Sequence, residues 1–220
     1  MNFDRIAPFY RAMEFLTAGG KLQKCRTAFL DEIPIPQRVL IAGEGHGRFL
    51  PECAAKFPDA RITVLDSSGK MLDIARRRTN SPQVEFVLAD ILDWDGPAGG
   101  YDLIVTNFFL DCFSADTLPT VISRLGDLAT PRAHWLLADF QIASGKMPAL
   151  RCRAILALLY AFFHFVCQLQ ASKLVPPDGL LSGNGFIRHR IRESDWGLLK
   201  SEWWHRTSRE IESKCQGEVH

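Results

Sequence analysis

The chain has 220 residues, which is enough for one sizeable core and short for two. It is 47% hydrophobic and 23% charged with a formal net charge of +1, a globular composition that gives no electrostatic reason to expect nucleic acid as a partner. The six cysteines form no C-x-x-C pair and have no histidine at ligand spacing, so neither a disulfide framework nor a metal site is expected, and reduced thiols favour a cytoplasmic protein.

Two helical segments are expected over residues 1–32, because apolar residues recur there at helical spacing on either side of Gly19 and Gly20. Pro34 and Pro36 end this N-terminal helical region. No apolar run follows a basic start, so no signal peptide is expected.

Strands and helices then alternate from residue 38 to residue 140. Apolar runs predict strands at 38–42, 61–65, 84–88, 101–106 and 133–139, and periodic segments predict helices at about 47–57, 69–78 and 115–128. Units of this length predict a parallel sheet with right-handed crossovers and helices on both faces.

The most apolar part of the chain is residues 148–171, which is too short and too closely followed by polar residues to span a bilayer. We interpret it as a core helix; the alternative is a helix that also walls an apolar substrate pocket or touches a membrane surface. A loop is expected at 172–185, an antiparallel strand pair at 185–193 and 198–205, and a polar tail at 208–220.

The stretch from Val39 to Leu50 carries the first functional signal. Four apolar residues run into Gly43, Gly45 and Gly47, which indicates a buried strand, a glycine turn and the start of a helix, a common arrangement for binding small ligands. The spacing is Gly-x-Gly-x-Gly, and the last glycine of a dinucleotide fingerprint would fall on Arg48 instead.

Polar residues end the next three strands, at the edge where open α/β sheets bind ligands. Asp66 follows the second strand, where a carboxylate can accept hydrogen bonds from ribose hydroxyls. Asp90 follows the third, where it can face an adenine amino group while Ile91 lies against the ring. Asn107 ends the fourth, where the reactive end of a donor would meet an acceptor.

These motifs together resemble the class I S-adenosylmethionine-dependent methyltransferases. The four stretches that carry the resemblance, in the family's order, are residues 39–47, 64–72, 89–91 and 102–110. Residues 3–10 and 137–140 are similar to the ubiquinone/menaquinone biosynthesis methyltransferases. The resemblance implies a Rossmann-like methyltransferase fold, with a seven-stranded, mostly parallel sheet and an antiparallel C-terminal strand pair.

The resemblance also implies the domain plan and the cofactor. Residues 1–207 form one domain, with a helical cap at 1–32, the S-adenosylmethionine-binding core at 38–140 and a helix and loop over the substrate side at 148–185. S-adenosylmethionine is the expected donor and S-adenosylhomocysteine the product, with no metal. The expected binding residues are Tyr10, Gly43, Glu44, Gly45, Gly47, Asp66, Ser67, Met71, Asp90, Ile91 and Asn107.

One position departs from the family pattern. Members usually carry an acid in the first strand where this chain has Ile41, and Glu44 stands three residues later. Glu44 either supplies the missing negative charge near the donor's amino group or sulfonium, or is an exposed loop acid.

Asp111 is the candidate catalytic base, because it follows the fourth strand and would face the acceptor; the alternative is that it caps the next helix. Tyr10 either closes the cofactor site, as the resemblance implies, or packs within its helix. His164 is expected to be a core histidine. Three arginines that alternate along one strand are expected to form a solvated strand face rather than an anion site: Arg188, Arg190 and Arg192.

The predicted function is in-line methyl transfer to a small, apolar or aromatic molecule, for which the donor supplies the reactivity and the protein the orientation. A non-catalytic donor-binding relative and, with less support, an NAD(P)-dependent oxidoreductase are the alternatives. Neither nucleic acid nor a transmembrane segment is expected, and a homodimer is left open.

Overall fold

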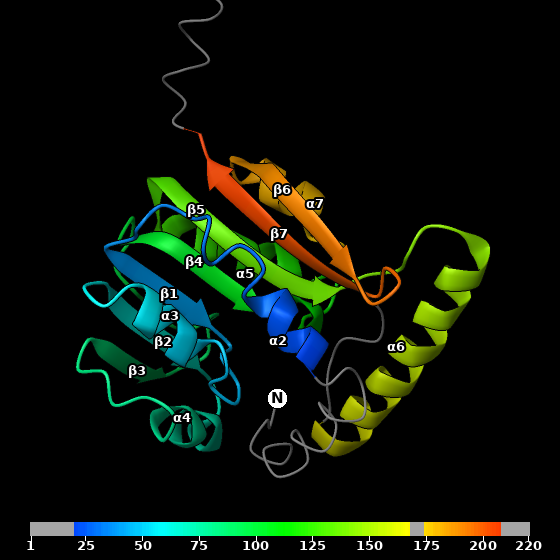
Figure 1. The fold of residues 1–220 in the computed structure, drawn as a ribbon, viewed down its shortest axis with the longest axis horizontal. Coiled ribbons are helices and arrows are strands. Elements are labelled where there is room, and N and C mark those ends of the chain that lie inside the picture. The colour runs from blue at the N-terminus through cyan, green and yellow to red at the C-terminus, as the bar shows by residue number, and fades with distance from the viewer. Residues whose placement is uncertain (1–19, 168–173, 208–220) are drawn as a thin grey trace, which may run out of the picture.

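A seven-stranded sheet organises the computed structural model, which describes residues 20–167 and 174–207 (Figure 1). The spatial order of the strands is β3-β2-β1-β4-β5-β7-β6. The five strands from β3 to β5 in this order are parallel, and β7 and β6 are added antiparallel. The strands are β1 (Arg38–Ala42), β2 (Arg61–Asp66), β3 (Val84–Leu88), β4 (Tyr101–Asn107), β5 (Ala129–Phe140), β6 (Phe186–Ser194) and β7 (Leu199–Arg206). The predicted fold class is confirmed.

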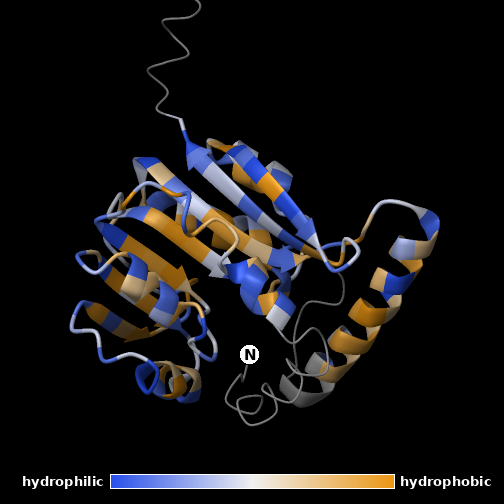
Figure 2. Cartoon of the chain, in the orientation of Figure 1, coloured by the Kyte–Doolittle hydropathy of each residue, from blue (hydrophilic) through white to orange (hydrophobic). Residues whose placement is uncertain are grey.

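Helices cover both faces of this sheet, as Figure 1 shows. They are α2 (Gly20–Arg26), α3 (Leu50–Lys56), α4 (Gly69–Arg76), α5 (Leu118–Leu128), α6 (Lys146–Cys167) and α7 (Asp178–Gly183), with a short 3₁₀ turn η2 (Leu110–Cys112). Because the central strands are covered on both sides, they are continuous apolar runs rather than alternating ones, and Figure 2 shows them as hydrophobic.

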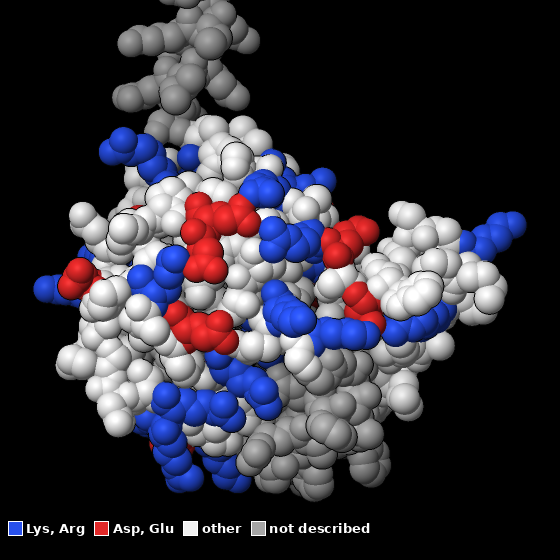
Figure 3. Space-filling view, viewed as in Figure 1, with Lys and Arg blue, Asp and Glu red and all other residues white. Residues whose placement is uncertain are grey.

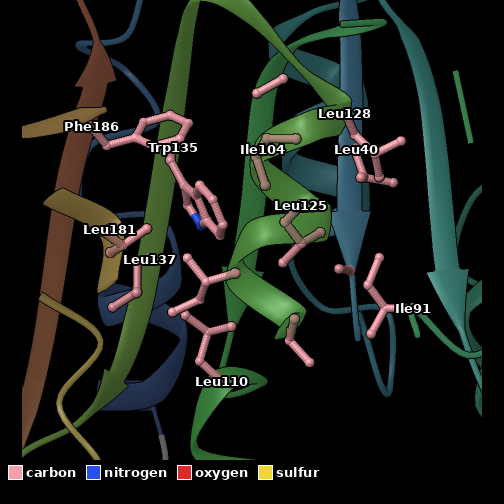
Figure 4. Packing of buried hydrophobic residues seen from close by; sticks show 14 of the residues in the cluster. Leu40, Ile91, Ile104, Leu110, Leu125, Leu128, Trp135, Leu137, Leu181 and Phe186 are labelled. Carbon is pink, nitrogen blue, oxygen red and sulfur yellow. The ribbon is translucent and has the colours of Figure 1, made fainter. Parts of the chain in front are cut away.

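One core lies between the sheet and α5. Figure 4 shows Leu125 and Leu128 packed toward Leu40, Ile104 and Trp135 of three strands. The second core lies on the opposite face, where α3 and α4 cover the alternate residues of the same strands. It includes Val39, Ile41, Val64, Leu50, Phe57 and Leu72. Successive residues of a strand point to opposite faces, so β1 contributes to both cores.

The strand order positions the site. The chain runs from β1 outward to β3 and then returns to place β4 on the other side of β1, so the connections diverge at the carboxyl end of β1. Ligands of open α/β sheets bind at such a switch point. The glycine turn, Asp66, Asp90 and Asn107 all follow strands that end at this edge.

The main differences from the sequence-based expectation concern α7, the start of β5 and the side chain of His164. The loop expected at 172–185 contains α7, which places Leu181 in the α5 core and is closed by a hydrogen bond of 2.8 Å from the Asn184 side-chain amide to the Leu180 carbonyl. β5 begins at Ala129 rather than at 133. His164 is exposed on α6, so the prediction of a core histidine is wrong.

Several predictions lie outside the described residues: the first N-terminal helix with Tyr10, residues 168–171 of the apolar stretch, and the polar tail. Among the helices that the structure does describe, none has the length and apolarity needed to cross a bilayer.

Candidate functional site

The glycine turn after β1 has three glycines at positive φ, between 59° and 70°. A Cβ on Gly43 would lie 2.1 Å from the Phe109 ring, and one on Gly47 would lie 2.6 Å from the Cα of Ala75 in α4. A Cβ on Gly45 would meet no atom of the described residues within 4 Å. Gly43 and Gly47 are therefore required by packing, whereas Gly45 presents bare backbone to open space, as ligand-contacting glycines do.

Glu44 binds the start of α3. Its Oε1 atom accepts hydrogen bonds from the backbone N–H groups of Phe49 (2.8 Å) and Leu50 (2.9 Å). Burial raises the pKa of Glu44 to about 7, although these amides and the nearby Arg26 favour the charged form. Glu44 is thus a half-buried residue whose carboxyl binds the start of the helix, and the alternative of an exposed loop acid is wrong. Whether it also meets the donor stays a prediction.

Asp66 connects two turns at the sheet edge. One carboxylate oxygen accepts from the Gly45 N–H (3.3 Å) and the other accepts from the Ser68 N–H (2.9 Å). The Ser68 hydroxyl in turn caps α4 by accepting from the Met71 N–H at 3.2 Å. Ser67 is exposed beside Asp66, and Met71 is buried at 3% exposure, so Ser67 is the more accessible of the two predicted contacts.

Asp90 and Ile91 form the turn after β3. Asp90 is half-buried, and its Oδ1 atom accepts from the Leu92 N–H at 3.0 Å. Arg124 of α5 donates to the Ile91 carbonyl at 2.8 Å, which ties this turn to the sheet. The Ile91 side chain belongs to the α5 core, which leaves little of it for contact with an adenine ring. Its role as a binding residue stays a prediction.

Asn107 is the unexplained polar group of the site. It is only 7% exposed, and its Nδ2 atom has no hydrogen-bond partner among the described residues. An unsatisfied buried donor costs free energy, so it needs a partner such as a ligand. The next residue, Phe108, has a φ of 53° and donates from its N–H to the Ala138 carbonyl at 2.7 Å. This strained turn fixes the direction of the chain after β4.

Asp111 lies in η2, beyond the carboxyl end of β4. Burial raises its pKa to about 6, and the Cys112 thiol lies 3.7 Å from its carboxylate. The N-cap residue of α5 is Thr117, so Asp111 does not cap that helix and the capping alternative is wrong. The Tyr160 hydroxyl of α6 donates to the Asp111 carbonyl at 3.4 Å, which brings α6 to the same place.

Asp139 is a site residue that sequence reasoning missed. It stands near the end of β5 at 2% exposure, and its Oδ1 atom accepts from the Phe140 N–H at 2.8 Å. Burial and the neighbouring Asp111 raise the pKa of Asp139 well above its ordinary value. Its place at a strand end was a usable signal, but its proximity to Asp111 and Tyr160 depends on elements far apart in sequence.

The position of the missing first-strand acid is closed to solvent. Ile41 is fully buried in the core beneath α3 and α4, so an acid there would need a partner that the apolar neighbours do not offer. The arginines of β6 form ion pairs rather than an open anion site: Arg188 with Asp178 and Glu202, and Arg190 and Arg192 with Glu32.

Known proteins share the segment that carries this site. A family model described as "Methyltransferase domain" matches residues 39–132, which contain the glycine turn, Asp66, Asp90 and Asn107. Residues 39–132 are thus similar to a methyltransferase domain, and the curated relatives and solved structures support the predicted resemblance to the class I S-adenosylmethionine-dependent methyltransferases. Nothing in these comparisons supports the oxidoreductase alternative.

The curated relatives match part of their own length. A trans-aconitate 2-methyltransferase of Methylobacterium radiotolerans is 35% identical over 123 residues, which is 54% of this chain and 42% of the relative. A release factor glutamine methyltransferase of Chlorobaculum tepidum is 36% identical over 103 residues, 44% of this chain and 32% of the relative. The chain thus spans less than half of either protein.

The fold also matches solved structures. The 1,6-didemethyltoxoflavin N1-methyltransferase of Burkholderia thailandensis, determined with S-adenosylhomocysteine bound, has a TM-score of 0.66 over 93% of this chain and 86% of that one. At 17% identity this likeness concerns the fold.

The residues of the site fit the family's cofactor, S-adenosylmethionine. Asp66 offers carboxylate oxygens for hydroxyl donors. Among the described residues, Gly45 has open space beside its backbone and the buried amide of Asn107 lacks a partner. When bound, this cofactor supplies an electrophilic methyl group on a sulfonium.

Proposed function

We propose that the protein methylates a small, apolar or aromatic molecule, using S-adenosylmethionine as donor. The observation that supports this most is the composition of the region beyond β4 and β5. It combines the carboxyl group of Asp111 with several aromatic side chains, of which Phe108 and Phe140 pack with tilted rings at 5.1 Å between centroids. An apolar region with few polar groups is typical of small-molecule sites.

The Gly43–Gly47 turn and Asp66 would hold the donor, and Asn107 would contact its reactive end. Fixing donor and acceptor in line lowers the barrier, because little freedom remains to be lost at the transition state. The aromatic side chains around η2 would orient the acceptor and exclude water.

Asp111 would act as the general base. A carboxyl with a pKa of about 6 is ionised at neutral pH and still basic enough to accept a proton from a hydroxyl, amine or acidic carbon. Asp139 is more deeply buried beside it, and burial together with the charge of Asp111 raises the pKa of Asp139 well above its ordinary value.

Methyl transfer to a panel of acceptors tests this proposal. The protein would be incubated with S-adenosylmethionine carrying a labelled methyl group and with phenols, quinone precursors, aliphatic acids, peptides and RNA, and products identified by mass spectrometry. Label in an apolar or aromatic small molecule is expected. Label confined to peptide or RNA would contradict the acceptor class, and donor binding without transfer to any acceptor would favour the non-catalytic alternative.

A further inference from the structure

Helix α6 exposes an apolar face that the described part of the chain leaves open to solvent. Met147, Leu150 and Leu158 are 77%, 63% and 74% exposed. They lie on one side of the helix because their spacing of three and eight residues corresponds to one and two turns, and the exposed Ala154 and Ala161 fall between and beyond them. Figure 1 shows α6 at the edge of the molecule, and Figure 2 shows hydrophobic residues along its length.

This face is distinct from the one that packs on the domain. Cys152, Leu156 and Leu159 are buried, the first two of them in a cluster with residues of α2 and β7. A surface helix normally places polar residues opposite its buried stripe. Here the side opposite the buried stripe is apolar as well, so the open face is not a by-product of core packing.

Basic residues border the open face on both sides. On a helical projection Lys146, Arg153 and His164 fall along one edge and Arg151 along the other. The 22-residue helix contains no Asp or Glu. Figure 3 shows basic and uncharged surface, without acidic side chains, at the outer end of this helix. An apolar centre with basic edges is the pattern of helices that lie in the surface of an anionic membrane.

An exposed tryptophan lies next to the first turns of α6. Trp196, in the turn between β6 and β7, is 80% exposed. The turn is held to α6 by Arg151, which donates to the carbonyl and the carboxylate of Asp195 at 3.0 Å. Lys21 also pairs with that carboxylate, so two cations neutralise the negative charge of Asp195 beside the helix. Tryptophan favours the interface between water and lipid, where its ring is half in apolar surroundings.

We propose that α6 docks flat on an anionic lipid surface, with Met147, Leu150 and Leu158 inserted among the lipids and Trp196 at the headgroup level. The three insertion residues extend over about 17 Å of helix, given a rise of 1.5 Å per residue. The flanking cations select lipid over a second protein copy as the occupant, because two copies would bring their own basic edges together whereas anionic headgroups neutralise them.

Vesicle flotation with the full chain tests this proposal independently of any methyl transfer. Binding is expected to vesicles of phosphatidylcholine mixed with phosphatidylglycerol, to weaken with added salt, and to be absent on phosphatidylcholine alone. Leu150→Gln combined with Leu158→Gln should lower the partition coefficient at least about tenfold. Lys146→Gln combined with Arg153→Gln should lower it about 30-fold at low salt.

Matched controls separate the face from general properties of the chain. Ile35→Gln removes an apolar side chain that is 86% exposed elsewhere, and Arg61→Gln with Arg132→Gln removes two exposed charges at the amino ends of β2 and β5. These variants should bind as the wild type does. The emission of Trp196 should shift to shorter wavelength on binding, and Trp196→Phe should abolish the shift.

Equal binding by wild type and the Leu150/Leu158 variant, or no binding to anionic vesicles, would overturn the proposal. A dimer in gel filtration that these substitutions dissociate, without vesicle binding by the wild type, would assign the face to a second copy of the chain. Circular dichroism of each variant establishes that it is folded.

Discussion

The carboxyl group of Glu44 makes the stability of this domain depend on pH in a predictable direction. It extends from the glycine turn to the start of α3, where it accepts hydrogen bonds from Phe49 and Leu50, and burial of this carboxyl raises its pKa from 4.5 to about 7. In the native state Glu44 therefore retains a proton that the unfolded chain releases above pH 4.5. The contribution of Glu44 to the free energy of unfolding is then highest below pH 4.5, falls between pH 4.5 and about 7, and is constant above.

The size of this effect follows from the shift of the pKa. At about 1.4 kcal/mol per pKa unit, Glu44 lowers the free energy of unfolding by up to about 3 kcal/mol across that interval. Glu44→Gln keeps an oxygen acceptor for the two amides but does not titrate, so it removes this slope. Glu44→Ala leaves both amides without their acceptor and should cost about 2 to 4 kcal/mol at the pH where the wild type is most stable.

Urea unfolding of wild type and Glu44→Gln at several pH values measures the predicted slope directly. The difference in unfolding free energy between them should shift in favour of Glu44→Gln by about 3 kcal/mol as the pH rises through this interval. Ile35→Gln, an exposed change that adds and removes no titratable group, should show no comparable pH dependence relative to wild type. A difference between wild type and Glu44→Gln that stays constant with pH would refute the assignment of a buried, titrating Glu44.

Two further predictions concern the glycine turn and the acceptor side. Gly47→Ala should destabilise the domain by more than about 2 kcal/mol, because its Cβ meets the backbone of Ala75. Gly45→Ala should cost only about 1 kcal/mol of stability and should mainly weaken donor affinity. Thermal unfolding measures the first effect and donor titration the second, and equal effects of both variants on both quantities would contradict the difference in packing. Asp111→Asn should lower kcat/KM by roughly 10²- to 10⁴-fold and should abolish the rise in rate as the pH passes through about 6. Donor affinity should not change. A variant that keeps the pH profile of the wild type would exclude Asp111 as the base.

The architecture was predictable because the central strands are apolar on both faces and are followed by glycine or end in polar residues such as Asp66 and Asn107. β1 and β3 have the predicted bounds, and β2 and β4 differ by one residue at one end. α7 was not predictable, because Pro177, Gly179 and Gly183 are typical of a loop and only the burial of Leu181 against α5 explains a helix there. Tertiary packing overrides local propensity in such short segments.

The donor side of the site was predictable to the extent that it depends on strand ends. Asp66 and Asn107 lie where their sequence positions indicated. The acid that binds α3 was not predictable, because the contact joins Glu44 to amides that are exposed only once the helix begins at Leu50. The grouping of Asp111, Asp139 and Tyr160 was not predictable either, since it depends on how α6 returns to the sheet edge.

Calorimetric titration of S-adenosylmethionine into the wild-type chain and into Asp66→Asn tests the assignment of the donor site most directly. The wild type should bind one equivalent, and Asp66→Asn should bind at least about tenfold more weakly, because a charge-assisted acceptor for hydroxyl donors is lost. Absence of binding to the wild type, or the same affinity in both proteins, would contradict the placement of the donor at the carboxyl ends of β1 and β2.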